Sequence, residues 1–367
     1  MRILHLTVLN PLTHTRIYHK LAISQANAGH EVHIAGQGKP AESLPSSQLF
    51  FHSTGTFYRL SLRRVLISFR LAQVIRRVKP VVIYVHTPEL LLLGKWAHRK
   101  HRCQVIYDVH EDYFATIKGA EYYPAWIRHP LAKVIRTLEH RARNWLSGVQ
   151  YAENCYDNIL DISPKKYRVV RNTFSNRMLE KQADLQILED DYLLLTGTLH
   201  DDWGLSATLD LWKELRKYLP LKLVVAGFAP QPESLSPVYG LQQTYPDEVF
   251  LYGGKTYLPY EHIIHLIQNC WAGTAFYHPF PHLQEKVPTK FYEFMAMRRP
   301  LLFTPFPYWV GINEGDKIGL ALSEDLSPDK IIESLTEWKP TAEQEDFGWK
   351  IDEQRMLELL EKVIKIL

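Results

Sequence analysis

Two glutamates, Glu285 and Glu293, stand on either side of a stretch whose residue types predict the start of a helix. Pro288 suits the first helical turn, where its missing N–H is not needed, and Thr289 or the residues just before it can cap that turn. The backbone N–H groups and the helix dipole at such a start attract anions such as a diphosphate. A carboxylate in the first turns, here Glu293, can accept hydrogen bonds from sugar hydroxyls. The stretch therefore predicts an anion and sugar site; an amphipathic core helix with a solvated acidic face is the alternative.

Two histidines follow predicted buried strands, His86 after residues 81–85 and His110 after residues 104–107. Ligands of open parallel sheets bind just beyond the carboxyl ends of the strands, so both positions are candidates for a site. A hydrogen-bonded structural role is the alternative for each histidine. The acidic pair that follows His110 has no further ligands at metal-binding spacing, so we expect no metal.

Strands and helices alternate twice along the chain, which predicts an α/β protein with two Rossmann-like doubly wound domains. The expected division is a first domain over 1–172, a linker over 173–190, a second domain over 191–350 and a final amphipathic helix over 351–367. The final helix is a candidate to pack back on the first domain. Gly197, at the end of a strand over 192–196, would let a phosphate approach the backbone closely; a simple turn glycine is the alternative.

The composition narrows the function classes. The chain has 367 residues and a formal net charge of only +3, which argues against a dedicated nucleic-acid binder. Its three cysteines are far apart and predict neither a disulfide framework nor a zinc site. The sequence has no signal-peptide pattern and no apolar run of about 18 residues or more, so we expect a cytoplasmic protein.

A basic amphipathic helix is predicted over residues 59–79. Such a helix can lie on an anionic bilayer surface, which would make the protein peripheral at the inner face of the membrane. The alternative is that its apolar side packs on the sheet while its arginines are solvated.

Three motifs resemble the retaining glycosyltransferases of the GT-B fold, the "group 1" or family 4-like enzymes. The first is the family's Pro-x-Lys-(Leu/Phe)-(Phe/Tyr)-Glu-(Tyr/Phe)-Met-Ala motif, matched from Pro288 to Ala296. The second combines Thr15–Lys20 with the turn from Ala28 to Val32, and the third is the run from Asp108 to Tyr113. Together they span nearly the whole chain in the family's order.

The resemblance implies two domains that face a central cleft and an enzyme that moves a sugar, hexosyl or N-acetylhexosaminyl, with retention of configuration. The donor would be a UDP- or GDP-linked nucleotide-sugar and the acceptor a glycan or lipid-linked hydroxyl, in glycan, polysaccharide or glycolipid assembly. No cofactor and no essential metal are implied. The implied site residues are Glu285 and His110 as catalytic; Glu293, Lys290, Thr289, Gly197, Thr198, Arg171, Asn172 and His278 at the donor; and Arg16 and His86 on the acceptor side.

One departure from the family pattern keeps other functions open. The family places Arg or Lys shortly after the turn at Gly197, whereas residues 200–204 are HDDWG and hold no cation. Lys290, Arg171 or Lys255 would have to substitute. The alternatives are a non-catalytic protein that binds nucleotide or a partner, and a nucleotide-sugar epimerase, which would convert the donor without any acceptor.

Overall fold

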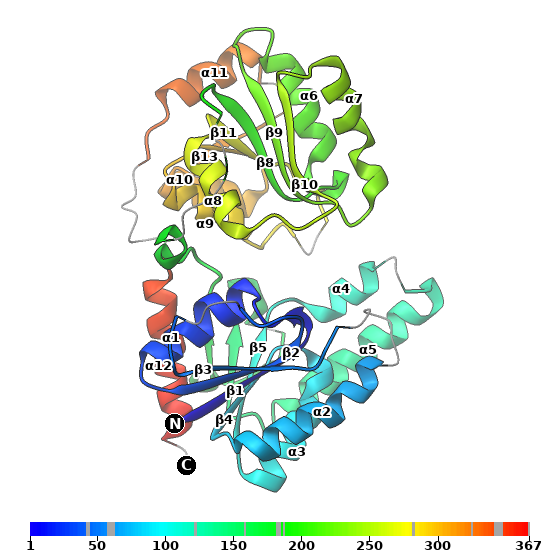
Figure 1. Cartoon of the computed structure of the whole chain (residues 1–367), viewed down its shortest axis with the longest axis vertical. Coiled ribbons are helices and arrows are strands. Elements are labelled where there is room, and N and C mark those ends of the chain that lie inside the picture. The colour runs from blue at the N-terminus through cyan, green and yellow to red at the C-terminus, as the bar shows by residue number, and fades with distance from the viewer. Residues whose placement is uncertain are drawn as a thin grey trace. The chain divides into compact units, whose positions relative to one another are not determined.

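The computed structural model describes residues 1–41, 45–56, 63–120, 123–157, 159–180, 185, 188–280, 283–323, 326–340 and 348–365 (Figure 1). The chain forms two compact units: unit 1 holds residues 1–172 and 349–367, and unit 2 holds residues 173–348. The described part of the expected linker, 173–190, thus belongs to unit 2, and the final helix belongs to unit 1. Each unit is built on one parallel sheet, of seven and six strands, so the predicted pair of doubly wound α/β domains is confirmed.

Unit 1 has the strand order β3-β2-β1-β4-β5-β6-β7. The order reverses between β1 and β4, which makes the carboxyl ends of these two strands the switch point where ligands of such sheets bind. Its main elements are β1 (Arg2–Pro11), the π-helical η1 (Thr15–Ala22), α1 (Ile23–Asn27), β2 (Glu31–Gln37), β3 (Leu49–Ser53), α2 (Arg63–Val78), β4 (Val82–Val85), α3 (Leu91–His101), β5 (Gln104–Val109), α4 (Tyr113–Gly119), α5 (Ala125–Ala142), β6 (Gly148–Tyr151), β7 (Tyr167–Val169) and α12 (Trp349–Ile364).

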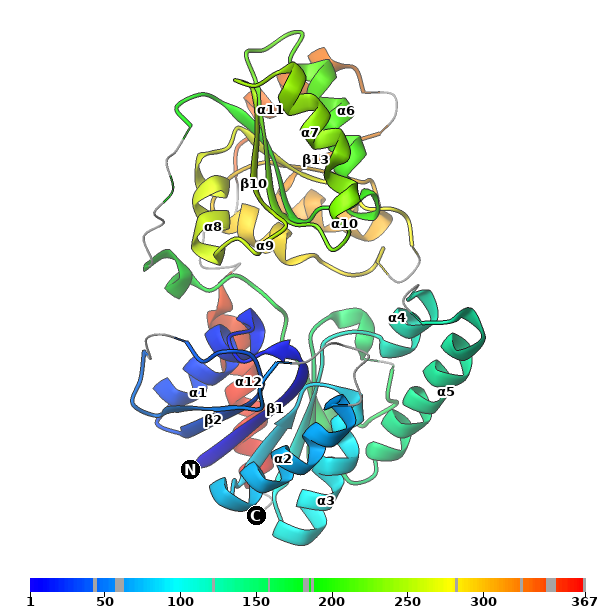
Figure 2. The ribbon, with the colours of Figure 1, turned by 45° about the vertical axis from the view of Figure 1, so that its right-hand side comes forward.

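Helices cover both faces of this sheet, which is why its central strands are apolar on both sides (Figures 1 and 2). Leu4 and Leu6 of β1 share a buried cluster with α2 and α3, whereas Ile3 shares one with α1 and α12. His5, which follows Leu4, is fully buried, although the strand around it is apolar. A buried polar side chain in such a strand requires a hydrogen-bond partner.

Helix α2 carries the described part of the predicted basic helix. Its residues Ile67, Leu71 and Ile75 are buried in the core of unit 1, and Arg70 donates to the backbone oxygen of Thr54 at 2.8 Å. Arg59 lies outside the described residues. The packing alternative therefore accounts for the described apolar side, and contact with a membrane surface stays a prediction. Among the described residues, no helix has the length and the apolar character needed to cross a bilayer.

Unit 2 has the strand order β10-β9-β8-β11-β12-β13, with its switch point between β8 and β11. One face packs on α8, α9 and α10 and the other on α6, α7 and α11. Its main elements are β8 (Tyr192–Thr198), α6 (Leu205–Leu215), β9 (Lys222–Phe228), α7 (Ser236–Thr244), β10 (Val249–Gly254), α8 (Tyr260–Asn269), β11 (Ala272–Ala275), α9 (Thr289–Ala296), β12 (Leu301–Phe303), α10 (Pro307–Asp316), β13 (Gly319–Ala321) and α11 (Pro328–Glu337).

A glycine on β11 allows α9 to lie close against the sheet. A Cβ atom on Gly273 would stand 2.0 Å from the ring of Phe294, so only glycine leaves room for that ring. Phe294 is the residue next to Glu293, and both are buried. The close packing therefore fixes the helix that carries the glutamate and lysine of the predicted donor site.

Candidate functional site

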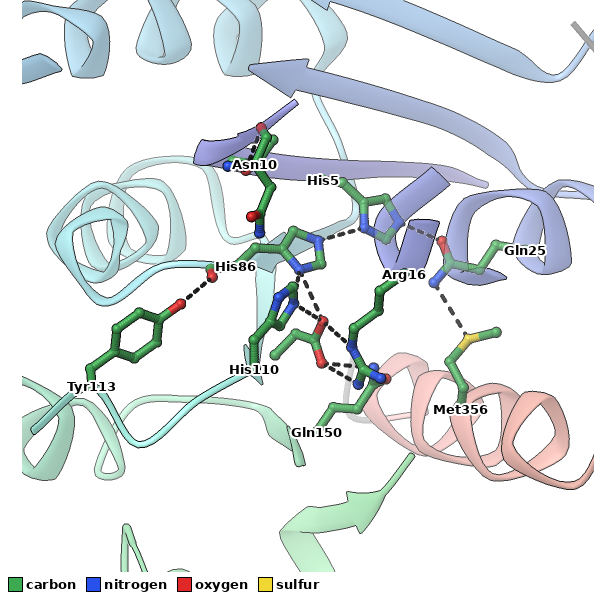
Figure 3. Close-up of polar contacts among 11 residues, drawn as sticks. His5, Asn10, Arg16, Gln25, His86, His110, Tyr113, Gln150 and Met356 are labelled. Carbon is green, nitrogen blue, oxygen red and sulfur yellow. Dashed lines mark hydrogen bonds and ion pairs between the residues drawn. The ribbon is translucent and has the colours of Figure 1, made fainter. Parts of the chain in front are cut away.

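The carboxylate of Asp108, near the end of β5, is the centre of a buried polar cluster in unit 1 (Figure 3). Its Oδ1 accepts from Arg16 Nη2 at 2.7 Å and from Gln150 Nε2 at 2.9 Å. Its Oδ2 lies 3.1 Å from Arg16 Nε, 3.0 Å from His86 Nδ1 and 2.6 Å from His110 Nε2. Three of the predicted site residues thus meet on a carboxylate to which the sequence assigned no role.

The chemistry of this cluster is set by the charge on Asp108. Burial alone would raise the pKa of this carboxyl group, but the Arg16 guanidinium and the donors of His110 and His86 outweigh burial and hold the pKa well below its usual range. Asp108 is therefore ionised, and its charge is balanced by Arg16.

A second layer supports His86 from the opposite side. His5 Nδ1 lies 2.9 Å from His86 Nε2, and His5 Nε2 lies 2.7 Å from the side-chain amide of Gln25 in α1. Burial lowers the pKa of His5 to about 3 and that of His86 to about 4, so both rings are neutral. The amide of Gln25 also contacts Met356 Sδ of α12 at 3.5 Å. The cluster thus extends from the carboxyl edge of the sheet to the final helix.

Arg16 and His86 were expected to contact the acceptor, but both side chains are buried in the cluster. The side chain of Arg16 is 2% exposed and that of His86 is 0% exposed, whereas His110 keeps 10% exposure. Arg16 lies in the π-helical η1, an unusual conformation that often marks functional sites. We therefore interpret Arg16 and His86 as residues that act through Asp108, with His110 as the residue that reaches the surface of the cluster.

His86, Asp108 and His110 also offer three ligand atoms within 4.8 Å of one another, close enough to hold a metal ion. A divalent cation there would have to displace the protons that link both rings to the carboxylate, beside a guanidinium that contacts the same Oδ2. Such a donor set fits a hydrogen-bonded cluster better than it fits a metal.

Arg171 and Asn172, which we predicted to bind the donor, lie in unit 1 and contact its first helix and its last helix. The backbone N–H of Arg171 donates to Asp352 Oδ1 at 3.0 Å, and its guanidinium lies 3.3 Å from Asp352 Oδ2. Asn172 accepts from Lys20 Nζ through both its backbone oxygen, at 3.0 Å, and its side-chain oxygen, at 2.6 Å. We interpret both residues as the connection that ties α12 and η1 to the end of β7.

The candidate donor site in unit 2 is organised by Lys290, in the first turn of α9. Its Nζ donates to the backbone oxygen of Thr196 at 2.8 Å and contacts that of Thr274 at 3.4 Å. Thr196 lies near the end of β8 and Thr274 near the end of β11. The ammonium group therefore bridges the two strands of the switch point. Pro288 takes the N-cap position of α9 and no side-chain hydrogen bond among the described residues caps the helix, whereas we predicted a cap from Thr289 or the residues just before it.

The other predicted site residues of unit 2 lie on β8, on α9 and in the segment between β11 and α9. Glu293 Oε1 accepts from the Tyr260 hydroxyl at 2.7 Å, and burial raises the pKa of that phenol well above its usual range. Gly197, with a φ of 101°, and Thr198 are the exposed last residues of β8. The remaining three, all exposed, are Thr289 at the start of α9, Glu285 in the segment before it, and His278, whose backbone N–H donates to Asp202 O at 2.9 Å.

Lys290 gives the protein a predictable pH dependence. Burial lowers its pKa to about 8, against 10.5 in an unfolded chain, while the charge of Glu293 opposes that shift. Between these values the unfolded chain holds a proton that the folded protein has lost, so the free energy of unfolding rises with pH. We expect wild type to gain roughly 3 kcal/mol over Lys290→Met across that window, at about 1.36 kcal/mol per pKa unit.

Urea unfolding at intervals from pH 7 to 11 measures this gain. Lys255→Met, which removes one charge from an exposed turn, is the matched control. A difference between wild type and Lys290→Met that stays constant over the whole series would contradict the prediction.

Sequence reasoning missed the polar residues that complete the cluster in unit 1. His5, Asp108 and Gln150 lie on β1, β5 and β6, and all three are fully buried. The available signal was a polar residue within a short apolar run, as in LHL or GVQY. His14, whose Nδ1 is buried with no partner among the described residues, lies beside His110 with ring centroids 5.9 Å apart. No sequence signal pointed to it.

The fold and the two polar clusters define an α/β protein with a candidate ligand site at the switch point of each unit. Residues 14–172 match the family model of the glycosyl transferase 4-like domain. Sucrose-phosphate synthase from Thermosynechococcus elongatus has a similar structure, with a TM-score of 0.71 at 13% identity over 100% of both chains. No curated protein has a matching sequence.

Two further solved structures have the same fold. HepE from Anabaena, in complex with UDP and glucose, matches with a TM-score of 0.63 at 12% identity over 100% of this chain and 99% of its own. AviGT4, a glycosyltransferase involved in avilamycin A biosynthesis, matches with a TM-score of 0.60 at 14% identity over 100% and 98%. Both units therefore have the fold of these solved structures, and residues 14–172 match a domain of the family that the motifs resemble.

Proposed function

We propose that the protein is a retaining glycosyltransferase that moves a hexosyl or N-acetylhexosaminyl group from a UDP- or GDP-linked donor to a hydroxyl acceptor. The observation that carries this proposal is the position of Lys290. Its ammonium group bridges the carboxyl ends of β8 and β11, so a buried positive charge and the N-terminus of α9 lie together at the switch point of unit 2. Charge that develops on a leaving diphosphate is stabilised by such preorganised groups.

In this proposal Glu293 binds the ribose hydroxyls of the donor and Glu285 its sugar hydroxyls. The Tyr260 hydroxyl, which donates to Glu293 Oε1 at 2.7 Å, holds that carboxylate in place and leaves it able to accept further hydrogen bonds. Gly197 and Thr198 offer an exposed strand end beside Thr196, the residue that Lys290 contacts. We further propose that His110 of unit 1 contacts the sugar and the acceptor. The expected role of the enzyme is in exopolysaccharide, lipopolysaccharide or glycolipid assembly.

Nucleotide binding tests the donor site before any acceptor is known. Thermal unfolding is measured with UDP, GDP, ADP and their sugar conjugates. A ligand at a hundred times its Kd stabilises by about 2.7 kcal/mol, which for domains of this size raises the Tm by several degrees, at very roughly 2–4 °C per kcal/mol. We expect one base alone to produce this shift, and we expect Glu293→Gln to lose it.

Glu214→Gln is the matched control, because it makes the same change at an exposed glutamate near the end of α6. It should retain the nucleotide shift. The configuration of the transferred sugar, read from the anomeric proton signal of the product, then tests retention. If no nucleotide stabilises wild type, the non-catalytic alternative gains weight, and the acidic HDDWG segment after Gly197 is its physical basis. Conversion of the donor sugar without an acceptor would favour the epimerase.

A further inference from the structure

The cluster in unit 1 determines which nitrogen of His110 carries a proton. An ionised carboxylate has no proton to donate, so a group that forms a hydrogen bond with it must donate. His110 Nε2 lies 2.6 Å from Asp108 Oδ2, and Asp108 is ionised because Arg16 compensates its charge. The proton of a neutral His110 ring therefore lies on Nε2, and Nδ1 keeps a lone pair.

The neighbouring ring leaves this assignment unchanged. His86 Nδ1 lies 3.0 Å from Asp108 Oδ2 and 3.1 Å from His110 Nε2. If His86 Nδ1 carries the proton of its ring, it donates to Asp108; if it does not, it accepts from His110 Nε2. In the second arrangement His86 Nε2 donates to His5 Nδ1, 2.9 Å away, and His5 Nε2 donates to the Gln25 side-chain oxygen at 2.7 Å. In both arrangements the proton of a neutral His110 ring lies on Nε2.

We propose that Asp108, with Arg16, is a positioning residue that locks His110 in the tautomer protonated at Nε2, so that Nδ1 accepts a hydrogen bond from a substrate hydroxyl. This inference rests on the proposed function for the identity of the substrate, but the tautomer itself does not depend on it. The site at His110 then prefers a hydroxyl, which can donate, over a fluoro or methoxy group, which cannot.

Arg16 fixes the orientation of the Asp108 carboxylate. Its guanidinium contacts both carboxylate oxygens, through Nη2 at 2.7 Å and Nε at 3.1 Å. A bidentate contact of this kind fixes the plane of the carboxylate, and with it the direction from Oδ2 to His110. Gln150 adds a further donor on Oδ1 at 2.9 Å, on the side away from the rings.

Long-range 1H–15N correlation spectra of protein labelled with 15N-histidine test the tautomer without any substrate. His110→Gln assigns the His110 signals by their loss. We expect wild type at pH 7.5 to have a protonated Nε2 and an unprotonated Nδ1. In Asp108→Asn, the amide oxygen can take the place of Oδ1 and accept from Arg16 Nη2 and from Gln150. The amide NH2 group then takes the place of Oδ2. Because that group can only donate, His110 Nε2 must accept. The proton should then move to Nδ1.

Gln150→Met is the matched control, since it removes a donor from Oδ1 and leaves both rings on Oδ2; its His110 signals should stay in the wild-type tautomer. A wild-type ring protonated at Nδ1, or an unchanged tautomer in a folded Asp108→Asn, overturns the proposal. The wild-type spectrum decides the tautomer even if Asp108→Asn does not fold.

Turnover separates positioning from a purely structural role. We expect Asp108→Asn to lower kcat at least about tenfold, and we expect no further loss when Asp108→Asn is added to His110→Gln, because both changes remove the same contact. Additive losses would overturn action through His110. An absence of glycosyl transfer by wild type would instead contradict the proposed function, and the tautomer result would stand without it.

Discussion

Replacement of Arg16 by Met lowers the free energy of unfolding of unit 1 by about 3–5 kcal/mol, because it leaves the buried carboxylate of Asp108 without its counter-charge. The pair is almost completely buried, with 2% exposure on Arg16 and 0% on Asp108. Removal of one partner from such a pair lowers the free energy of unfolding more than replacement of both partners does. Arg16→Met combined with Asp108→Asn should therefore lose less than the sum of the two single variants.

An exposed ion pair of the same type is the control. Arg143 contacts Asp161 Oδ2 at 2.7 Å, with 37% and 83% exposure, so Arg143→Met should cost under about 1 kcal/mol. Urea unfolding followed by a probe in unit 1 measures both variants. Similar losses for Arg16→Met and Arg143→Met would mean that Asp108 is not held as an ion.

The same pair predicts the behaviour of the protein in acid. The pKa of Asp108 in the folded state lies well below 3.8, the value for an unfolded chain. Its contribution to stability is therefore complete above that value and is lost as the pH falls through the folded pKa. The loss of stability in acid should therefore depend on the Arg16–Asp108 pair. Urea unfolding below pH 5 should give a different pH dependence for Arg16→Met than for wild type.

Removal of α12 should unfold unit 1 and leave unit 2 folded. The helix starts at Trp349, 176 residues after the start of unit 2, yet it belongs to unit 1. Its residues Leu359, Leu360 and Val363 are buried in the cluster that holds Ile3 and Val32. Each such side chain contributes about 1.5–3 kcal/mol through burial. The summed contribution of the helix is therefore comparable with the free energy of unfolding of a typical domain, about 5–15 kcal/mol.

Calorimetry of a chain that ends at Gly348 tests this dependence, because the two units should give separate transitions in the full chain. We expect the transition of unit 1 to disappear and that of unit 2 to remain. A point variant gives the same test with less disruption: Leu360→Ala should cost about 2–5 kcal/mol, whereas Ile351→Ala, at a position 40% exposed, should cost far less. A unit 1 that melts unchanged after truncation would contradict the prediction.

Some elements of the fold could not be predicted because their burial gives no clear period. β3 has one buried residue in five, since it is the edge strand of its sheet. β13 has only three residues, all half-buried, at the edge of the other sheet.

Helix α4 begins directly after the DVHED run because Asp112 accepts from the backbone N–H groups of Phe114 and Ala115. We noted that run for its chemistry and did not interpret Asp112 as a helix cap.

The sequence by itself determined the two α/β domains, the helix motif from Pro288 to Ala296 and the position of His110 at a strand end, because each depends on neighbours within a few residues. Only the tertiary structure decided which polar side chains meet. Arg16 reaches Asp108 across 92 positions, and Gln25 reaches Met356 across 331. Periodicity reports which face of a strand or helix is buried, but it carries no information on which distant group lies opposite. The partner of a buried charge is therefore set by the packing of whole elements, and that packing brings Arg16 and His86, predicted on the acceptor side, into contact with Asp108.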